Sequence, residues 1–407
     1  MKKVLLIIEA GSNREYAFKA LKDCNLFKII LMTRKESLYG YEKWVDECIQ
    51  VDTNNYEELK NKVIALKDYN IDGVMTLLEW YVPITEKIKE EFGFIGNSYK
   101  TAIRARNKYS MRKALQEHGL KTPAFFKCTN FEEVQAAFRS LKDPSCIIKP
   151  IEDTGSTNVK RVSNDKELLE AYNEIIRKDL NSRGQLLSKD VLIEEFLDGQ
   201  EYSVDSLTID GKTEVLAIND YITTKGPHFV ELGLSTPSML SNEIQAQLKE
   251  TAIMAINAIG IKNGPSHCEI KLTLRGPIVI EIGARHGGGY IPELIKLTTG
   301  FDFYVQTALV FCKEQIEINI SHITAAATRK IYAKNSGVIK SIKNTQIARK
   351  MKGCNEIIIK SKVNDFIDKE IKDYSSFAGY VITTADSPIE AIHCAEAIRE
   401  TIEIDVS

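Results

Sequence analysis

The fold of this chain follows from one stretch, His267-Cys-Glu-Ile-Lys-Leu-Thr-Leu-Arg-Gly-Pro-Ile-Val-Ile-Glu-Ile-Gly283. Apolar and polar residues alternate on both sides of Arg275, which predicts two antiparallel strands joined by a tight turn. If the hairpin is symmetric about Arg275, the side chains of Glu269 and Glu281 lie directly opposite each other. Two facing carboxylates destabilise a sheet, and Mg²⁺ held by one or two carboxylates plus substrate phosphates relieves that repulsion. The sequence therefore predicts a metal site here, against the alternative that both glutamates lie on an exposed, solvated face.

A glycine-rich segment follows the hairpin directly: Ala284-Arg285-His286-Gly287-Gly288-Gly289. Three glycines between a strand end and a helix start form a backbone that can wrap an anion. Arg285 comes two residues after the strand, where its guanidinium could reach the same phosphate through two hydrogen bonds. The alternative is a flexible loop at the start of a helix, which leaves the clustering with the two glutamates unexplained.

A second candidate segment is Cys146-Ile-Ile-Lys149-Pro150, followed by Gly155-Ser156-Thr157. A lysine at the end of an apolar strand needs an anionic partner, and the adjacent small polar loop makes phosphate a candidate. The other partner that fits is a protein carboxylate in a structural ion pair. The spacing is not that of a P-loop, so this motif is excluded.

A third candidate segment runs from Val191 to Asp205. The apolar strand ends at Glu194 and Glu195, the chain turns at Asp198-Gly199, and Glu201 restarts the next strand. Such an edge can offer backbone groups to a planar base and a carboxylate to a ribose diol, but it is also an ordinary hairpin.

The chain before residue 100 predicts a different architecture. Short apolar runs alternate there with helical segments, which is typical of a parallel, doubly wound sheet; the runs cover residues 4–8, 28–32, 48–51 and 73–77. The turn from Glu9 to Arg14 holds one glycine where a dinucleotide fingerprint has three, which argues against a nicotinamide or flavin site. We expect a tight turn with Ser12 or Asn13 as the helix N-cap.

Beyond residue 106 the pattern changes to long alternating strands between helices. Helices are expected over residues 108–118, 241–259, 290–312 and 388–401. Strands are expected over residues 191–195, 201–209, 213–222, 266–273, 277–283, 326–333, 355–360 and 379–384.

Composition limits the function classes. A length of 407 residues allows two to four domains. The 54 basic and 56 acidic residues give a net charge of −2, so no global field draws the chain to nucleic acid or an anionic membrane. No uncharged apolar stretch reaches the roughly 20 residues of a membrane span. The 8 cysteines are scattered without a C-x-x-C pair, which favours reduced thiols and a cytoplasmic location.

Taken in order, these segments resemble the ATP-grasp superfamily over about residues 1 to 400. Glu281-Ile-Gly-Ala-Arg285 with its three glycines, and Pro227 to Gly233 upstream, most resemble the L-amino acid ligases and related carboxylate–amine ligases. The implied fold is mixed α/β and α+β. Its parts are a Rossmann-like pre-ATP-grasp domain (1–105), ATP-grasp subdomains A and B with antiparallel sheets (106–189 and 190–321), and a small C-terminal α+β domain (322–407).

The resemblance also implies residue roles for ATP and Mg²⁺ (or Mn²⁺). Lys108 and Lys149 would contact phosphates, and Gly155, Ser156 and Thr157 would cover them. Glu194 and Leu197 would offer backbone groups to adenine, Glu195 would lie beside it, and Glu201 would bind the ribose. Glu269 and Glu281 would hold the metal, and Arg285 would be catalytic, on the transferring phosphate. Many relatives have Asn where this chain has Gly283, which leaves the number of metal ions open.

Substrate residues are predicted around the same site. His228 and Glu231 lie in a loop that could close over the substrates, with Glu231 a candidate for binding an amino group; His228 is otherwise a surface histidine. The backbone amides of Gly287, Gly288 and Gly289 could hold a carboxylate or an acyl phosphate. Glu79 follows a parallel strand, where a cleft opens, and is a further candidate.

The implied activity is amide bond formation between small carboxylate and amine substrates, with amino acids expected, through an acyl phosphate and with release of ADP and phosphate. A carboxylating ligase of the biotin-carboxylase or purine-pathway type would share the ATP residues but phosphorylate bicarbonate. A nucleotide-binding sensor would bind ATP without releasing phosphate. No nucleic acid or membrane partner is expected, and a homodimer is possible.

Overall fold

The computed structural model describes residues 1–11, 14–35 and 40–407. Ser12 and Asn13, predicted as the N-cap of the first helix, lie outside these ranges. That helix, α1, begins at Glu15.

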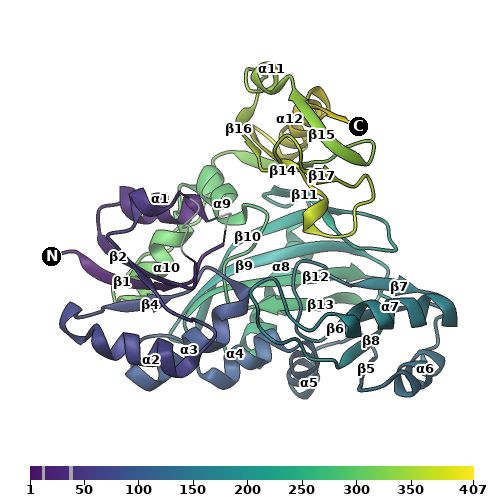
Figure 1. Ribbon diagram of the computed structural model, residues 1–407, viewed down its shortest axis with the longest axis horizontal. Coiled ribbons are helices and arrows are strands. Elements are labelled where there is room, and N and C mark those ends of the chain that lie inside the picture. Colours follow the sequence, from purple (N-terminus) through teal and green to yellow (C-terminus); the bar gives the residue numbers. More distant parts are fainter. Residues whose placement is uncertain (12–13, 36–39) are drawn as a thin grey trace.

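The N-terminal region contains a four-stranded parallel sheet in the order β3-β2-β1-β4, which confirms the predicted doubly wound arrangement (Figure 1). Its strands are β1 (Lys3–Ile8), β2 (Phe27–Thr33), β3 (Glu47–Gln50) and β4 (Gly73–Met75). One face packs on α2 and α3, and the other packs on α1 and on α10, a helix from much later in the chain. These helices are α1 (Glu15–Asp23), α2 (Tyr56–Ala65), α3 (Val82–Phe92) and α10 (Phe303–Phe311).

Two antiparallel sheets follow, as the ATP-grasp resemblance implies. The smaller has the order β5-β8-β6-β7, and α6 and α7 pack on it. Its elements are β5 (Phe125–Cys128), α6 (Phe131–Ser140), β6 (Cys146–Pro150), β7 (Lys160–Val162), α7 (Asp165–Arg177) and β8 (Val191–Glu195).

The larger sheet has eight strands in the order β13-β12-β9-β10-β11-β14-β18-β16 (Figure 1). Helices α5 and α8 share an apolar core with its first strands. The elements before residue 300 are α4 (Tyr99–Arg106), α5 (Lys108–Glu117), β9 (Gln200–Ile209), β10 (Lys212–Thr223), β11 (Glu231–Thr236), α8 (Asn242–Ile259), β12 (Gly264–Thr273), β13 (Gly276–Gly283) and α9 (Ile291–Thr299).

The C-terminal region continues this sheet. Strand β14 (Ala325–Ile331) pairs with β11, and β18 (Gly379–Ala385) and β16 (Cys354–Ile359) extend the sheet beyond it. A separate three-stranded sheet, β17-β15-β19, and helices α11 and α12 complete the region, seen in yellow and light green in Figure 1. Their bounds are β15 (Gly337–Lys343), α11 (Thr345–Ala348), β17 (Phe366–Ile367), α12 (Pro388–Thr401) and β19 (Glu403–Val406).

The single helix predicted over residues 290–312 is wrong, because the chain forms two helices there, α9 and α10. Gly300 ends α9 with φ of 76°, a left-handed conformation that glycine adopts without strain. Asp302 then caps α10 by accepting a hydrogen bond from the backbone N–H of Val305. The break turns the chain, so that α10 packs on the N-terminal sheet while α9 stays with the large sheet.

The hairpin of β12 and β13 pairs Glu269 with Glu281, as predicted. The hairpin is not symmetric about Arg275 along its whole length, although the prediction assumed that it is. Near the turn Thr273 pairs with Gly276 and Ile270 with Val279, and the register then shifts between Glu269 and Ile270. Ile280 is the extra residue of this bulge. Continued without a shift, the ladder would pair Glu269 with Ile280, so the bulge brings the two carboxylates onto the same face.

In the part of the chain that the structure describes, no helix is long and apolar enough to cross a membrane. All eight cysteines are free thiols.

Candidate active site

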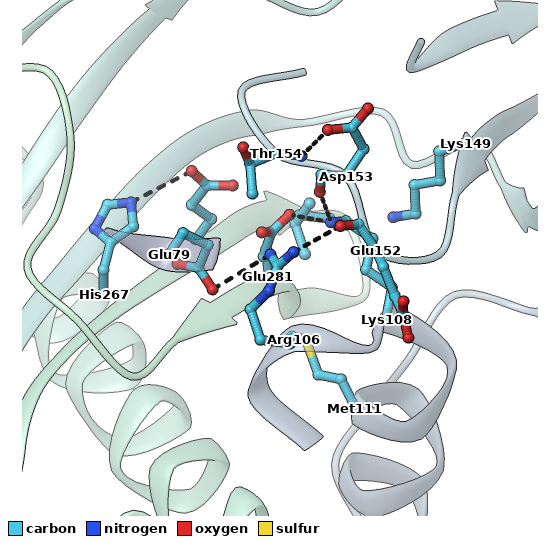
Figure 2. A network of polar contacts seen from close by, with 12 residues as sticks. Glu79, Arg106, Lys108, Met111, Lys149, Glu152, Asp153, Thr154, His267 and Glu281 are labelled. Atoms are coloured by element: carbon cyan, nitrogen blue, oxygen red, sulfur yellow. Dashed lines mark hydrogen bonds and ion pairs between the residues drawn. The ribbon is translucent and has the colours of Figure 1, made fainter. Parts of the chain in front are cut away.

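A cavity of about 620 Å³ lies where the N-terminal region, both antiparallel sheets and the C-terminal region meet. Most of the residues predicted from sequence line it: Glu79, Lys108, Lys149, Gly155, Ser156, Thr157, Glu201, Glu231, Glu269, Glu281, Arg285, Gly288 and Gly289. The structure therefore brings together segments that are far apart in the sequence (Figure 2).

Five of the predicted site residues are not among the described residues that line this cavity: Glu194, Glu195, Leu197, His228 and Gly287. Glu195 is partly exposed and pairs with Arg275 at 2.8 Å. The carbonyl of Leu197 accepts a hydrogen bond from Lys271 at 3.1 Å. The carbonyl of His228 accepts one from Thr224, which holds the loop.

Lys149 is buried, and its ammonium group pairs with Glu194 at 2.6 Å. Glu194 also accepts hydrogen bonds from Arg112, from Nε at 2.6 Å and from Nη2 at 3.3 Å. Burial raises the pKa of Glu194, but Arg112 and Lys149 outweigh it and the net pKa is lowered. Lys149 therefore forms the structural ion pair that the sequence analysis gave as the alternative to phosphate binding, and its partner is the side chain of Glu194. Lys149 nevertheless also lines the cavity.

Lys108 begins α5, behind Asn107, whose side chain caps the helix. Its ammonium group donates to the Asp153 carbonyl at 2.9 Å and pairs with Glu281 at 3.2 Å, as Figure 2 shows. The buried lysine is therefore held between the loop after β6 and the carboxylate of β13.

The paired glutamates of the hairpin offer hard oxygen ligands. Burial raises the pKa of Glu281, but Lys108 and Lys149 outweigh it and lower the pKa to about 2, so the carboxylate is ionised at neutral pH. Glu269 faces it across the strands. Among the described residues no group of three or more His, Cys, Asp and Glu side chains could hold a metal by itself. Mg²⁺ is commonly bound by one or two protein carboxylates, and substrate phosphates supply further oxygen ligands. The two glutamates therefore fit this ion.

His267 orients Glu269. Its Nδ1 lies 2.9 Å from Asp205, and its Nε2 lies 3.3 Å from Glu269. Burial lowers the pKa of His267, but Asp205 and Glu269 outweigh it and raise the pKa to about 10. A Cβ on Gly287 would come 2.7 Å from Asp205 and 2.9 Å from His267, so only glycine leaves room for this pair. Gly287 therefore has a packing role.

Glu201 lies in the same wall of the cavity as the hairpin carboxylates. Burial and the charge of Glu269 raise its pKa to about 7, although Lys271 opposes the shift. At neutral pH this carboxyl can donate as well as accept a hydrogen bond, and both its forms can bind the hydroxyls of a diol.

Arg285 and Glu79 form a pair across the cavity wall. Nε of Arg285 donates to Oε2 of Glu79, and Nη1 donates to the His286 carbonyl at 2.7 Å. Glu79 is buried and also lies 3.5 Å from Arg106. Burial lowers the pKa of Arg285, but Glu79 and Glu281 outweigh it and raise it. Glu79, predicted as a substrate residue, thus holds the guanidinium of Arg285 in place.

Glu231 connects the cavity to the C-terminal region. The ammonium group of Lys330, fully buried in β14, donates to the Glu231 carbonyl at 2.6 Å and pairs with Oε2 at 3.0 Å. The Tyr374 hydroxyl donates to the same Oε2 at 3.3 Å. Oε1 of Glu231 is buried and has no hydrogen-bond partner in the described chain. A Cβ on Gly155 would lie 3.0 Å from the Tyr374 ring, so this tyrosine also covers the glycine loop.

Several site residues escaped the sequence analysis: Arg106, Arg112, Asp153, Asp205, Lys330 and Tyr374. Two of them carried a usable signal. Arg112 lies four residues after Lys108, so both cations share one face of a helix that packs on the sheet. Lys330 lies next to Arg329 in the strand Ala325–Ile331, every residue of which is buried, and a cation buried in a strand requires a carboxylate partner. Tyr374 follows no regular strand or helix pattern and could not be found in this way.

Comparison with known proteins supports this architecture. Residues 142–293 match the ATP-grasp domain family, and residues 329–407 match the L-amino acid ligase C-terminal domain 2. The crystal structure of the L-amino acid ligase from Bacillus licheniformis superposes with a TM-score of 0.87 at 26% sequence identity, covering 100% of this chain and 99% of that chain.

Two relatives of known activity are also similar. The chain is 23% identical to the L-arginine-specific L-amino acid ligase of Bacillus subtilis, over 93% of this chain and 91% of the relative. It is 27% identical to the alanine–anticapsin ligase of Bacillus subtilis (strain 168), over 73% of this chain but only 65% of the relative.

Proposed function

We propose that this chain, an ATP-grasp protein of the L-amino acid ligase branch, is an ADP-forming ligase that joins a small carboxylate to a small amine, both amino-acid-like, in an amide bond. The observation that carries the proposal is the content of one cavity. Cations that can bind phosphate, a facing carboxylate pair, and Arg285 with Gly288 and Gly289 all meet there. Transfer of a phosphoryl group needs positioning and charge neutralisation rather than a protein nucleophile, and this set of residues can supply both.

The reaction has two steps. A carboxylate oxygen of the first substrate attacks the γ-phosphorus of ATP, so that the bond to the β-γ bridging oxygen breaks and ADP leaves with that electron pair. The amine of the second substrate then attacks the acyl phosphate carbonyl, the C–O bond to phosphate breaks, and the amine loses a proton. The products are an amide, ADP and inorganic phosphate.

The residues of the chain fit these steps by charge and position. Lys108 and Lys149 would hold the ATP phosphates under the loop of Gly155, Ser156 and Thr157. Glu269 and Glu281 would hold Mg²⁺, which supplies neutralisation of the phosphate charge. Arg285, kept in place by Glu79, would stabilise charge on the transferring group and on the acyl oxygen.

Glu231 would bind the ammonium group of one substrate. Its unpartnered Oε1 is buried, and a buried carboxylate oxygen without a donor costs free energy that a substrate N–H recovers. Lys330 and Tyr374 hold the other oxygen, so the free one has a defined direction. The amides of Gly288 and Gly289, which line the cavity, would hold a carboxylate or acyl phosphate.

The test is a matrix of paired amino acids with ATP and Mg²⁺, in which phosphate release is measured and the coupled product is weighed by mass spectrometry. We expect release that depends on the amino acids and is lost on chelation of the metal, with Mn²⁺ as the replacement to compare. Release that requires bicarbonate would indicate a carboxylating ligase instead. Tight nucleotide binding without phosphate release in any mixture would indicate a sensor.

A further inference from the structure

One end of the cavity is chemically different from the phosphate-binding part. It is lined by Arg14, Tyr290, Glu293, Lys360 and Tyr380, none of which the proposed reaction uses. These residues come from the N-terminal region, the start of α9 and the C-terminal region. A role for this end rests on the proposed function, because it concerns which substrate binds there.

Four of the cations that line the cavity are neutralised by the protein. Lys108 pairs with Glu281, Lys149 with Glu194, Lys178 with Asp153 and Arg285 with Glu79. Arg14, Arg183 and Lys360 line the same cavity, but among residues 1–11, 14–35 and 40–407 none of the three forms an ion pair with a carboxylate. Two of them, Arg14 and Lys360, belong to the end described above. This end therefore has uncompensated positive charge.

Lys360 lies over aromatic rings. Its ammonium nitrogen is 4.3 Å from the ring centre of Tyr380 and 5.5 Å from that of Tyr290, and the two rings meet edge to face at 4.9 Å. Burial, with the charges of Lys330 and Arg14, lowers its pKa to about 8, although Glu15 opposes the shift. The rings reduce the exposure of this cation to water without neutralising it, so an anionic group entering here gains more than it would in solvent.

Glu293, a carboxyl at the same end of the cavity, is a weak counter-ion for Arg14. Oε1 of Glu293 accepts a hydrogen bond from the Tyr304 hydroxyl at 3.1 Å, and its buried Oε2 has no partner in the described chain. Burial raises the pKa of Glu293 to about 7, although the charge of Arg14 opposes the shift, so the group is about half protonated at neutral pH. Glu293 thus leaves much of the charge of Arg14 and Lys360 available to a ligand.

We propose that this end of the cavity binds an anionic side chain, the carboxylate of an acidic amino acid, between the ammonium of Lys360 and the guanidinium of Arg14. The rings of Tyr290 and Tyr380 form the wall for its methylene groups. Glu231, which lines the same cavity and has an unpartnered Oε1, binds the ammonium of that amino acid. A substrate with one ammonium and two carboxylates matches this distribution of charges.

The experiment compares aspartate and glutamate with asparagine and glutamine, which have the same shape without the charge. Phosphate release with ATP and Mg²⁺ gives kcat/KM for each, paired with a common neutral amino acid. Calorimetric binding of the same four amino acids to the protein with ADP and Mg²⁺ gives dissociation constants that need no turnover. We expect the acidic member of at least one pair to be favoured by about tenfold or more in both measurements, the effect of one charged hydrogen bond.

Three variants test the assignment. Lys360→Met should reduce the preference for the acidic member by about tenfold, and Arg14→Met should reduce it in the same direction. Lys360→Glu should reverse it, so that lysine and ornithine are preferred over acidic amino acids. Lys362→Met is the matched control, because Lys362 is exposed on the same segment, and it should keep the wild-type preference.

The outcomes separate the two proposals. Equal use and equal binding of acid and amide by the wild-type protein, or a preference that Lys360→Met leaves unchanged, overturns the anionic subsite while the ligase activity stands. If no pair of amino acids releases phosphate but the binding preference is present and depends on Lys360, the ligase proposal fails and the subsite stands.

Discussion

Arg285 shows at the scale of one residue how the site is preorganised. Its guanidinium is held by Glu79 from the N-terminal region and by the carbonyl of the next residue. A donor fixed in this way needs no reorganisation when charge develops in a transition state. Holding Arg285 in this way requires the carboxylate of Glu79 to be buried, and Glu79 thereby loses solvation free energy.

Replacing Arg285 by alanine should lower kcat by about 100- to 1,000-fold, or about 3 to 4 kcal/mol, because one preorganised donor to the developing charge is lost. Steady-state phosphate release under saturating ATP and amino acids measures this. Arg139→Ala, on the exposed surface of α6, is the control and should leave kcat unchanged. Turnover close to that of the wild type in Arg285→Ala would remove Arg285 from the chemistry.

His286 follows Arg285 but has a structural role. Its Nε2 lies 3.0 Å from the Thr307 hydroxyl, and its ring packs on Phe303 and Tyr304 at 4.6 and 4.8 Å. Burial lowers its pKa to about 3, with the charge of Arg14 acting in the same direction. The neutral ring thus ties the glycine segment to α10.

The pKa of His286 predicts a pH dependence of stability. Between pH 6.5 and 3 the unfolded state binds a proton that the folded state does not, so the free energy of unfolding falls as the pH falls through this window and is flat above it. From pH 7.5 to 5.5 His286 should contribute a loss of about 1.4 kcal/mol. We expect His286→Gln, which can keep the bond to Thr307, to lose less stability than the wild type over this range, measured by urea unfolding. The same loss in both proteins would show that His286 is not the titrating group.

At the scale of the element, the β13 bulge and helix α5 act together. Nη2 of Arg112 donates to the carbonyl of Ile280, the extra residue of the bulge, at 2.7 Å. The same guanidinium binds Glu194 on β8 in the other sheet. One side chain thus supports the register that pairs Glu269 with Glu281 and joins the two sheets that surround the cavity.

Removing this link should be costly. Arg112→Met leaves the bulge carbonyl without its donor and Glu194 with Lys149 alone, and breaking a buried ion pair at one partner costs about 3 to 5 kcal/mol of unfolding free energy. Lys113→Met, the exposed neighbour on the same helix, should change stability by no more than about 0.5 kcal/mol. Urea unfolding of the two variants gives the comparison. Equal stabilities would mean that Arg112 is dispensable for this part of the fold.

At the scale of the whole molecule, the C-terminal region is part of the eight-stranded sheet that lines the cavity. Strands β11 and β14 pair over four residues, from Gly233 with Arg329 to Thr236 with Ala326. Lys330 and Tyr374 reach from that region to Glu231 in the cavity. The segment that matches the L-amino acid ligase C-terminal domain therefore contributes side chains to the site.

Such a continuous sheet should open as one unit. We expect the backbone amides of β11, β14 and β18 to exchange their hydrogens with closely similar free energies of opening, because separating any two strands exposes the apolar cores on both sides. Native-state hydrogen exchange with mass spectrometry measures this. Protection that is lost from β14 and β18 well before β11 would show that the C-terminal region opens independently.

The sequence by itself determined the local patterns and the chemistry of the segments. Alternation predicted the hairpin of Glu269 and Glu281, the glycines after Arg285 predicted an anion-binding loop, and the apolar runs predicted the parallel sheet. These signals are local, because side-chain periodicity follows the geometry of one strand or helix. The failure at residues 290–312 has a local cause as well: the left-handed turn at Gly300 interrupts an apolar pattern that continues on both sides.

Tertiary structure alone decided which partners the charged residues have. Lys149 was recognised, but its pairing with Glu194, the pairing of Glu79 with Arg285, and the reach of Lys330 to Glu231 join residues that are distant in the sequence. The bulge at Ile280 is of the same kind, because its carbonyl is held by a helix that lies elsewhere in the sequence. An ion pair or a register shift depends on which surfaces are packed together and desolvated, and no residue pattern along the chain contains that information.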